Sequence, residues 1–180
     1  MLRRRPRHRD DHRAPLIRRL TLLAVATVAG CQRESSPTAT TVPGAAVVEF
    51  VVDGDTVDVV IDGEEERVRL IGIDTPESRV ENGPPECFGP EASTFTAELL
   101  PAGTDVRLER DVVGRDDYGR LLAYVYRLDD GVFVNEAIVR QGYATPLSIE
   151  PNVTFADRFV VAASAAESEG LGLWAACSGG

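Results

Sequence analysis

Residues 45–73 hold the pattern that most restricts the fold: three runs of apolar and largely β-branched residues, separated by two turn signals. The runs read AAVVEFVV, TVDVVI and EEERVRLIGI, and the turns are Asp53-Gly54-Asp55 and Asp62-Gly63. β-branched residues favour strands, and a short Asp-Gly connection is typical of a hairpin. The pattern therefore predicts three consecutive antiparallel strands.

A long loop, a helix and two more strands are expected next. Residues 74–88 contain three prolines and show no periodicity, and such a loop inside a compact domain is usually functional. Ala92, Phe95 and Leu99 fall at helical spacing behind Pro90, which predicts a helix that ends before 101–103. Residues 105–110 and 120–128 have the composition of strands four and five.

Two further helices complete the expected fold. Residues 135–141 predict a short helix that Gly142 ends, and a last helix should begin near Thr154, with Asp157 at the capping-box position. Five strands with one helix after the third and two after the fifth predict an α+β fold. We expect a five-stranded, OB-type Greek-key β-barrel with three helices.

The first 30 residues have the composition of an export signal. Eight arginines in residues 1–19 precede an apolar run at 20–30, LTLLAVATVAG, which is too short to span a bilayer. The junction before Cys31 resembles the lipobox of bacterial lipoproteins. It predicts a lipid-modified Cys31, a flexible tether over 31–44, a domain over 45–177 and a tail at 178–180. We expect an exported protein anchored to the cell membrane.

Two alternatives remain open for this segment. A signal peptide could end near an unpaired Cys31, which would leave the protein secreted. The pair Arg18-Arg19 also leaves the choice between general and twin-arginine export undecided.

Charge and residue usage exclude several kinds of chemistry. The chain has no lysine, and His8 and His12 both lie in the predicted signal. After removal of residues 1–30, eleven arginines remain against 27 acidic residues, a net charge near −16. Histidine bases, Schiff bases and histidine-ligated zinc are therefore excluded from the mature domain. A chain with this much negative charge can bind a phosphate group only where arginines or a bound cation supply positive charge.

Cys87 and Cys177 are the cysteines that remain beyond Cys31. In an exported protein they predict one disulfide that ties the long loop to the C-terminus. A catalytic thiol is the alternative, and it would lack a histidine to activate it.

Four segments suggest a phosphodiesterase site: 53–56 (DGDT), 69–77 (RLIGIDTPE), 116–120 (DDYGR) and 135–142 (NEAIVRQG). Their order and spacing resemble those of the staphylococcal nuclease family, over about residues 46–174. From the residues alone, Asp55 and Asp74 should lie at the same end of the sheet and share a hard cation. Arg69 and Arg120 offer planar donors that suit phosphate oxygens.

The resemblance implies a role for each matching residue. Asp55, Asp74 and the carbonyl of Thr75 would bind Ca²⁺, and Glu77 would orient or deprotonate the attacking water. Arg69 and Arg120 would stabilise the transition state, and Tyr118 would contact a substrate phosphate. The implied enzyme is a monomeric, calcium-dependent nuclease that cleaves DNA and/or RNA and leaves 3′-phosphates.

The chain departs from the family in two places. Asp117 stands where the type member has a lysine, and the stretch TPLSIEPNV lacks an evident base-stacking tyrosine. Both departures should weaken substrate binding more than chemistry. A non-catalytic nucleic-acid- or protein-binding module is the alternative, and a calcium-binding envelope protein is a third hypothesis.

Overall fold

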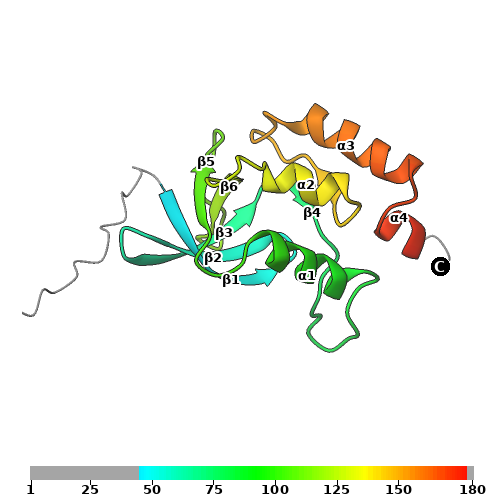
Figure 1. The fold of residues 1–180 in the computed structure, drawn as a ribbon, viewed down its shortest axis with the longest axis horizontal. Helices are drawn as coiled ribbons and strands as arrows, with labels where there is room; N and C mark the ends of the chain where they lie inside the picture. The colour runs from blue at the N-terminus through cyan, green and yellow to red at the C-terminus, as the bar shows by residue number, and fades with distance from the viewer. Residues whose placement is uncertain (1–44, 178–180) are drawn as a thin grey trace, which may run out of the picture. The chain divides into compact units, whose positions relative to one another are not determined.

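Five strands of the computed structural model, which describes residues 45–177, close into a barrel (Figure 1). In chain order they are β1 (Ala45–Asp53), β2 (Thr56–Ile61), β3 (Glu64–Leu70), β5 (Asp105–Glu109) and β6 (Leu121–Arg127). The order around the barrel is β1-β2-β3-β6-β5, with β3 and β6 parallel and the other neighbours antiparallel. This confirms the predicted OB-type barrel. The predicted signal, the lipidated Cys31 and the tether lie outside the described residues and stay predictions.

Four helices accompany the barrel: α1 (Gly89–Leu99), α2 (Val134–Arg140), α3 (Ala156–Ser168) and α4 (Leu173–Ala176). Figure 1 shows α2 between the barrel and α3, with α4 following α3 towards the C-terminus. The first three match the predicted helices. The fourth was missed because four residues are too few to show a helical period. Within residues 45–177, no helix has the length and apolar character needed to cross a membrane.

The predicted third strand, 64–73, is in fact two strands. β3 ends at Leu70, and β4 (Gly72–Asp74) leaves the barrel to pair with β7 (Thr145–Leu147). Gly72 has a φ of +83°, and a Cβ atom there would lie 2.2 Å from the ring of Phe159 in α3. Only glycine allows both this left-handed backbone and the close approach of α3. The kink turns Asp74 out of the barrel wall.

The start of the last helix also differs from the prediction. α3 begins at Ala156, and no side chain caps its N-terminus. Thr154 instead donates from its backbone N–H and its hydroxyl to the carboxylate of Asp111, at 3.0 and 2.9 Å. The predicted capping box of Thr154 with Asp157 was therefore wrong, because Thr154 uses its hydrogen-bond donors for the carboxylate of Asp111.

Disulfide formation between Cys87 and Cys177 agrees with the sequence prediction. The bond spans 90 residues of chain and joins the loop before α1 to the end of α4. A cross-link of this span removes much of the conformational entropy of the unfolded chain.

Asn135, at the start of α2, connects the helices to the barrel. Its side chain is completely buried, accepts a hydrogen bond from Val125 N at 2.9 Å and donates one to Ile71 O at 2.9 Å. Ile71 lies at the kink between β3 and β4, and Val125 lies in β6. The Asn135 amide therefore links the backbone of β6 to the kink between β3 and β4. This explains an asparagine in the motif NEAIVRQG on structural grounds.

We expect Asn135→Ala to lower the free energy of unfolding by about 3 kcal/mol, because two buried backbone groups lose their partners. Chemical denaturation followed by tryptophan fluorescence measures the change. Glu98→Ala, at an exposed position of α1, is the control and should change stability by less than about 0.5 kcal/mol. A loss as small as the control's would refute this role for Asn135.

Candidate functional site

An open cleft of about 890 Å³ lies on the barrel over β2 and β3. It brings together five of the residues singled out in the sequence: Asp55, Arg69, Glu77, Tyr118 and Arg120. They come from the β1–β2 turn, the end of β3, the long loop and the segment before β6. Residues separated by up to 65 positions thus face one space.

Asp55 is the most deeply placed acidic group of the cleft, with 7% of its surface exposed. Arg69 Nη2 lies 3.0 Å from Asp55 Oδ2, and Thr75 N donates to the same oxygen at 3.1 Å. Thr56 donates its hydroxyl to Oδ1 at 3.0 Å. Burial raises the pKa of Asp55, while the charge of Arg69 and these hydrogen bonds oppose the rise. Burial alone would favour the neutral acid, so Asp55 keeps a negative charge only beside a positive charge and hydrogen-bond donors.

Asp74 contacts the same guanidinium nitrogen as Asp55. Arg69 Nη2 is 3.0 Å from Asp74 Oδ1 as well as from Asp55 Oδ2, so the two carboxylates already share one cationic nitrogen. Arg69 Nη1 donates to Leu70 O at 2.8 Å and to Ile73 O at 3.1 Å, which secures the guanidinium at the kink. Asp55 and Asp74 thus lie close together, as the sequence predicts, and their sharing of a metal ion stays a prediction.

The donor set fits a hard cation. Two carboxylates that converge on one positive charge, next to the backbone of Thr75, are the oxygen ligands that Ca²⁺ takes, with water completing the shell. Within the described residues, no group of three or more His, Cys, Asp or Glu side chains is arranged to hold a metal. A site made of two carboxylates and one backbone carbonyl contains only two such side chains, so it does not need a group of three. Asp74 and Thr75 line a smaller neighbouring hollow rather than the main cleft.

Glu77 lies at the exposed edge of the cleft, with Asp53 as its closest acidic partner. Loss of hydration, a hydrogen bond with the side chain of Asp53 and the nearby negative charges raise the pKa of Glu77 to about 7. Asp53 is held by Gly54 N at 2.8 Å and by Ser78 N at 3.3 Å. A carboxyl group with this pKa exchanges protons readily near neutral pH, which suits a general base.

Arg120 is positioned by Asp116. Asp116 Oδ2 accepts from Arg120 Nε at 2.6 Å, and Oδ1 accepts from the backbone N–H groups of Tyr118 at 3.0 Å and Arg120 at 2.9 Å. Burial opposes it, but these hydrogen bonds lower the pKa of Asp116. The guanidinium lies 5.4 Å from the centre of the Tyr118 ring, which is 87% exposed. Arg120 and Tyr118 therefore present a planar cation and an aromatic face together.

Acidic groups outnumber arginines around the cleft. The acids are Asp53, Asp55, Asp58, Glu65, Glu66 and Glu77, and the arginines are Arg67, Arg69 and Arg120. Arg67 is also neutralised by Asp58 through two hydrogen bonds of 2.7 and 2.8 Å. A phosphodiester would be repelled by such a surface unless a further cation were bound to it.

A second hollow of about 540 Å³ adjoins the cleft and shares Arg69, Tyr118 and Arg120 with it. The stretch TPLSIEPNV contributes Leu147 and Ile149, both exposed, and Asp117 lines its edge. The stretch that lacks an evident base-stacking tyrosine thus presents aliphatic side chains to this hollow. Asp117 adds negative charge beside the two arginines.

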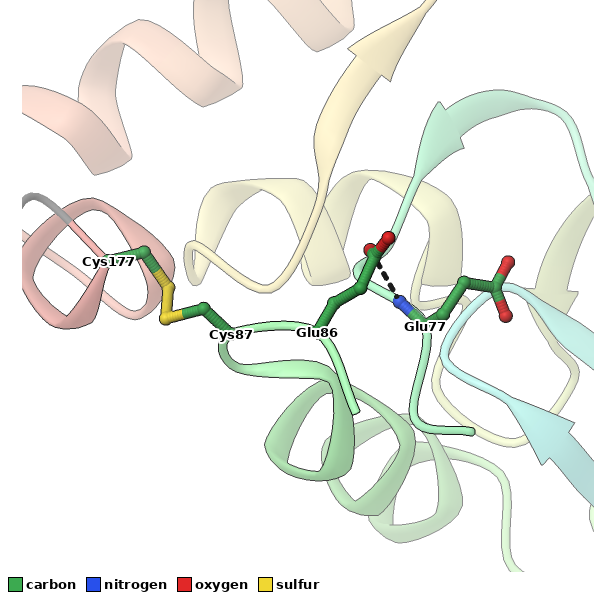
Figure 2. Close-up of a disulfide and its surroundings, with 4 residues drawn as sticks. All are labelled: Glu77, Glu86, Cys87 and Cys177. Atoms are coloured by element: carbon green, nitrogen blue, oxygen red, sulfur yellow. Dashed lines mark hydrogen bonds between the residues drawn. A yellow bond between two sulfur atoms is a disulfide. The ribbon is translucent and has the colours of Figure 1, made fainter. Parts of the chain in front are cut away.

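Three residues near the site were not expected to act from sequence: Asp53, Asp116 and Glu86. Asp53 reads as an ordinary hairpin residue, and Asp116 as part of a polar turn. Glu86 accepts a hydrogen bond from Glu77 N at 3.0 Å (Figure 2). The four-residue spacing of Asp116 and Arg120 was an available signal, but no local pattern pairs Glu86 with Glu77.

Comparison with known proteins identifies relatives across most of the described chain. The family profile described as "Staphylococcal nuclease homologue" matches residues 67–176. Thermonuclease of Staphylococcus intermedius is 41% identical over 128 residues, which are 71% of this chain and 74% of the relative. Thermonuclease of Staphylococcus hyicus is 40% identical over 124 residues, which are 69% of this chain and 72% of that protein. Endonuclease YncB of Bacillus subtilis (strain 168) is 38% identical over 129 residues, 71% of this chain and 60% of that protein.

We expect Glu77→Gln to raise Tm by a few degrees at pH 8 and to change it little at pH 5. The folded protein holds the pKa of Glu77 at about 7, above its ordinary value of 4.5, so its ionisation opposes folding as the pH rises through 7. Exposure of the side chain limits the size of the gain. Thermal unfolding at both pH values measures it, with Glu81→Gln in the same loop as the control. An equal shift of Tm at both pH values would rule out the raised pKa.

Proposed function

The chain belongs to the staphylococcal nuclease family, and we propose that this nuclease hydrolyses phosphodiester bonds of DNA and/or RNA with bound Ca²⁺ and leaves 3′-phosphate products. One observation carries the proposal. Asp55 and Asp74 converge on a single nitrogen of Arg69, and Asp55 and Arg69 line the same cleft as Glu77 and Arg120. This arrangement supports the proposal because the residues proposed as cation ligands, base and phosphate-binding groups lie next to one another.

Asp55, Asp74 and the backbone carbonyl of Thr75 would hold the cation. Ca²⁺ supplies positive charge for the phosphoryl oxygens and lowers the repulsion between the substrate and the acidic cleft. Asp55 is suited to this role because its buried carboxylate needs a positive charge beside it, and the cation would add to the charge that Arg69 supplies. The same argument explains why an acidic cleft is compatible with an acidic substrate.

Glu77 would accept the proton of the attacking water. Its carboxyl group lines the cleft, and a hydrogen bond with Asp53 contributes to raising its pKa to about 7. A base whose pKa lies near neutral pH is about half deprotonated there and can still take up a proton. Asp53 thus helps to set the proton affinity of Glu77.

Arg69 and Arg120 would stabilise the charge that develops on the phosphoryl oxygens. Arg69 is held by two backbone carbonyls and Arg120 by Asp116, so both guanidinium groups are oriented before the substrate arrives. Preorganised donors lower the barrier because little reorganisation accompanies the reaction. Tyr118, beside Arg120 and almost fully exposed, would contact a substrate phosphate through its hydroxyl.

The first test is cleavage of single-stranded DNA by the purified protein, with Ca²⁺ or with a chelator. We expect cleavage in Ca²⁺ only, and a loss of kcat of at least about a hundredfold in Arg120→Ala, because a preorganised donor to the transition state is removed. Arg140→Ala is a matched control, since Arg140 pairs with Glu169 outside the cleft. Absence of cleavage with every divalent cation would contradict the proposal and favour a binding module.

The second test concerns Asp117. Asp117→Lys reverses a charge beside Tyr118 and Arg120, so we expect KM to fall by roughly threefold to tenfold at low salt, with kcat nearly unchanged. The gain should shrink as the salt concentration rises. Glu98→Lys makes the same change of charge on α1, outside the cleft and the second hollow. A comparable fall of KM in that control would show a general effect of net charge instead.

A further inference from the structure

Two hydrogen bonds between the same two residues close the loop that carries Glu77. Glu77 N donates to Glu86 Oε2 at 3.0 Å, and Glu86 N donates to Glu77 O at 3.0 Å. Figure 2 shows the side chain of Glu77 pointing away from Glu86, so the contact holds the backbone and leaves the carboxylate available. The backbone position of Glu77 therefore depends on where Glu86 lies.

Glu86 is in turn held by its neighbour, Cys87, through the disulfide to Cys177 (Figure 2). Cys177 N donates to Leu173 O at 2.9 Å, and Leu173 N donates to Gly142 O at 2.8 Å. The far end of the disulfide is thus attached to the segment that follows α2. Through this bond the loop is connected to the packed helices, although it has few regular hydrogen bonds of its own.

The start of α1 adds a third restraint. Gly89 N donates to Glu86 O at 3.0 Å, and a Cβ atom on Gly89 would lie 2.2 Å from Glu77 O. The backbone of Glu77 is therefore in close contact with the first turn of α1. Residues 86–89 form one short support that contacts Glu77 on both its N–H and its C=O side.

The disulfide also borders the cation ligands. A hollow of about 320 Å³ is lined by both cysteines, Glu86, Asp74 and Thr75. Displacement of the disulfide would therefore shift the surroundings of Asp74 and Thr75 as well as the backbone of Glu77. Arg69, Tyr118 and Arg120 lie on β3 and before β6, which this bond does not restrain.

We propose that the Cys87–Cys177 disulfide and Glu86 form a brace that positions Glu77 for catalysis, so that full activity requires the oxidised disulfide. Glu86 acts as a positioning residue, and the inference rests on the role proposed for Glu77. Displacement of a reacting group by about 1 Å can cost about a hundredfold in rate. Loss of the brace should therefore lower kcat by about tenfold to a hundredfold and leave KM within about threefold.

The experiment compares kcat and KM on single-stranded DNA in Ca²⁺ for four proteins: the parent, Glu86→Ala, Glu86→Gln and Glu77→Gln. Glu86→Ala removes the acceptor of the Glu77 N–H while the disulfide stays intact. Glu86→Gln restores an acceptor oxygen and should regain most of the kcat that Glu86→Ala loses. Glu81→Ala, an exposed glutamate in the same loop, is the control for a change of charge.

The disulfide is tested in the parent and in Cys87→Ser/Cys177→Ser. Dithiothreitol transfers two electrons and two protons to the Sγ–Sγ bond, which yields two thiols and the cyclic disulfide of the reagent. Assays run well below the Tm of each form, so that only folded protein is compared. Hydrogen exchange at the Glu77 amide gives a second readout, and it should accelerate on reduction and in Glu86→Ala, but not in Glu81→Ala.

The outcomes separate the two proposals. If Glu77→Gln is inactive while reduction and Glu86→Ala lower kcat and speed exchange at Glu77, the brace is supported. If Glu77→Gln is inactive but reduction and Glu86→Ala leave kcat unchanged, the brace is overturned and the role of Glu77 stands. If Glu77→Gln keeps full activity, the role of Glu77 fails and the brace fails with it.

Discussion

The ion pairs of Arg69 with Asp55 and Asp74 organise the site. A carboxylate as buried as Asp55 is costly unless a positive charge and hydrogen bonds accompany it. Arg69 supplies the charge, and the carbonyls of Leu70 and Ile73 hold its guanidinium at the kink where the chain leaves the barrel. The kink itself depends on Gly72, against which Phe159 packs. Helix packing, strand geometry and the position of the cation ligands are therefore coupled.

The negative charge of the cleft is the reason to propose a bound cation. Carboxylates dominate its lining, and the guanidinium groups of Arg67, Arg69 and Arg120 each pair with a carboxylate. These pairs fix the direction of the arginines, although they also reduce the field available to a phosphate. Binding of Ca²⁺ at Asp55 and Asp74 would change that balance at the point where the phosphodiester must lie. An acidic nuclease could in this way attract the substrate only at the phosphodiester that reacts.

The long loop shows how a segment without regular structure can still hold the residue proposed as the base. Glu77 is held through hydrogen bonds to Glu86, contact with the first turn of α1 and the hydrogen bonds of Asp53 with Gly54 and Ser78. The disulfide extends this restraint to the C-terminal helices. These restraints come from different parts of the chain. The position of Glu77 therefore depends on the packing of several elements.

Local sequence determined the barrel strands and three helices, because runs of β-branched residues, Asp-Gly turns and helical spacing are short-range signals. It also indicated which residue types could act, since the chain has no lysine and no histidine after residue 12, and the family motifs pointed to Asp55, Arg69, Glu77 and Arg120. Only tertiary structure decided that the third strand breaks at Gly72, that Thr154 binds Asp111 and that Glu86 supports Glu77. These contacts join residues whose proximity depends on packing between separate elements, and no local periodicity encodes such a distance.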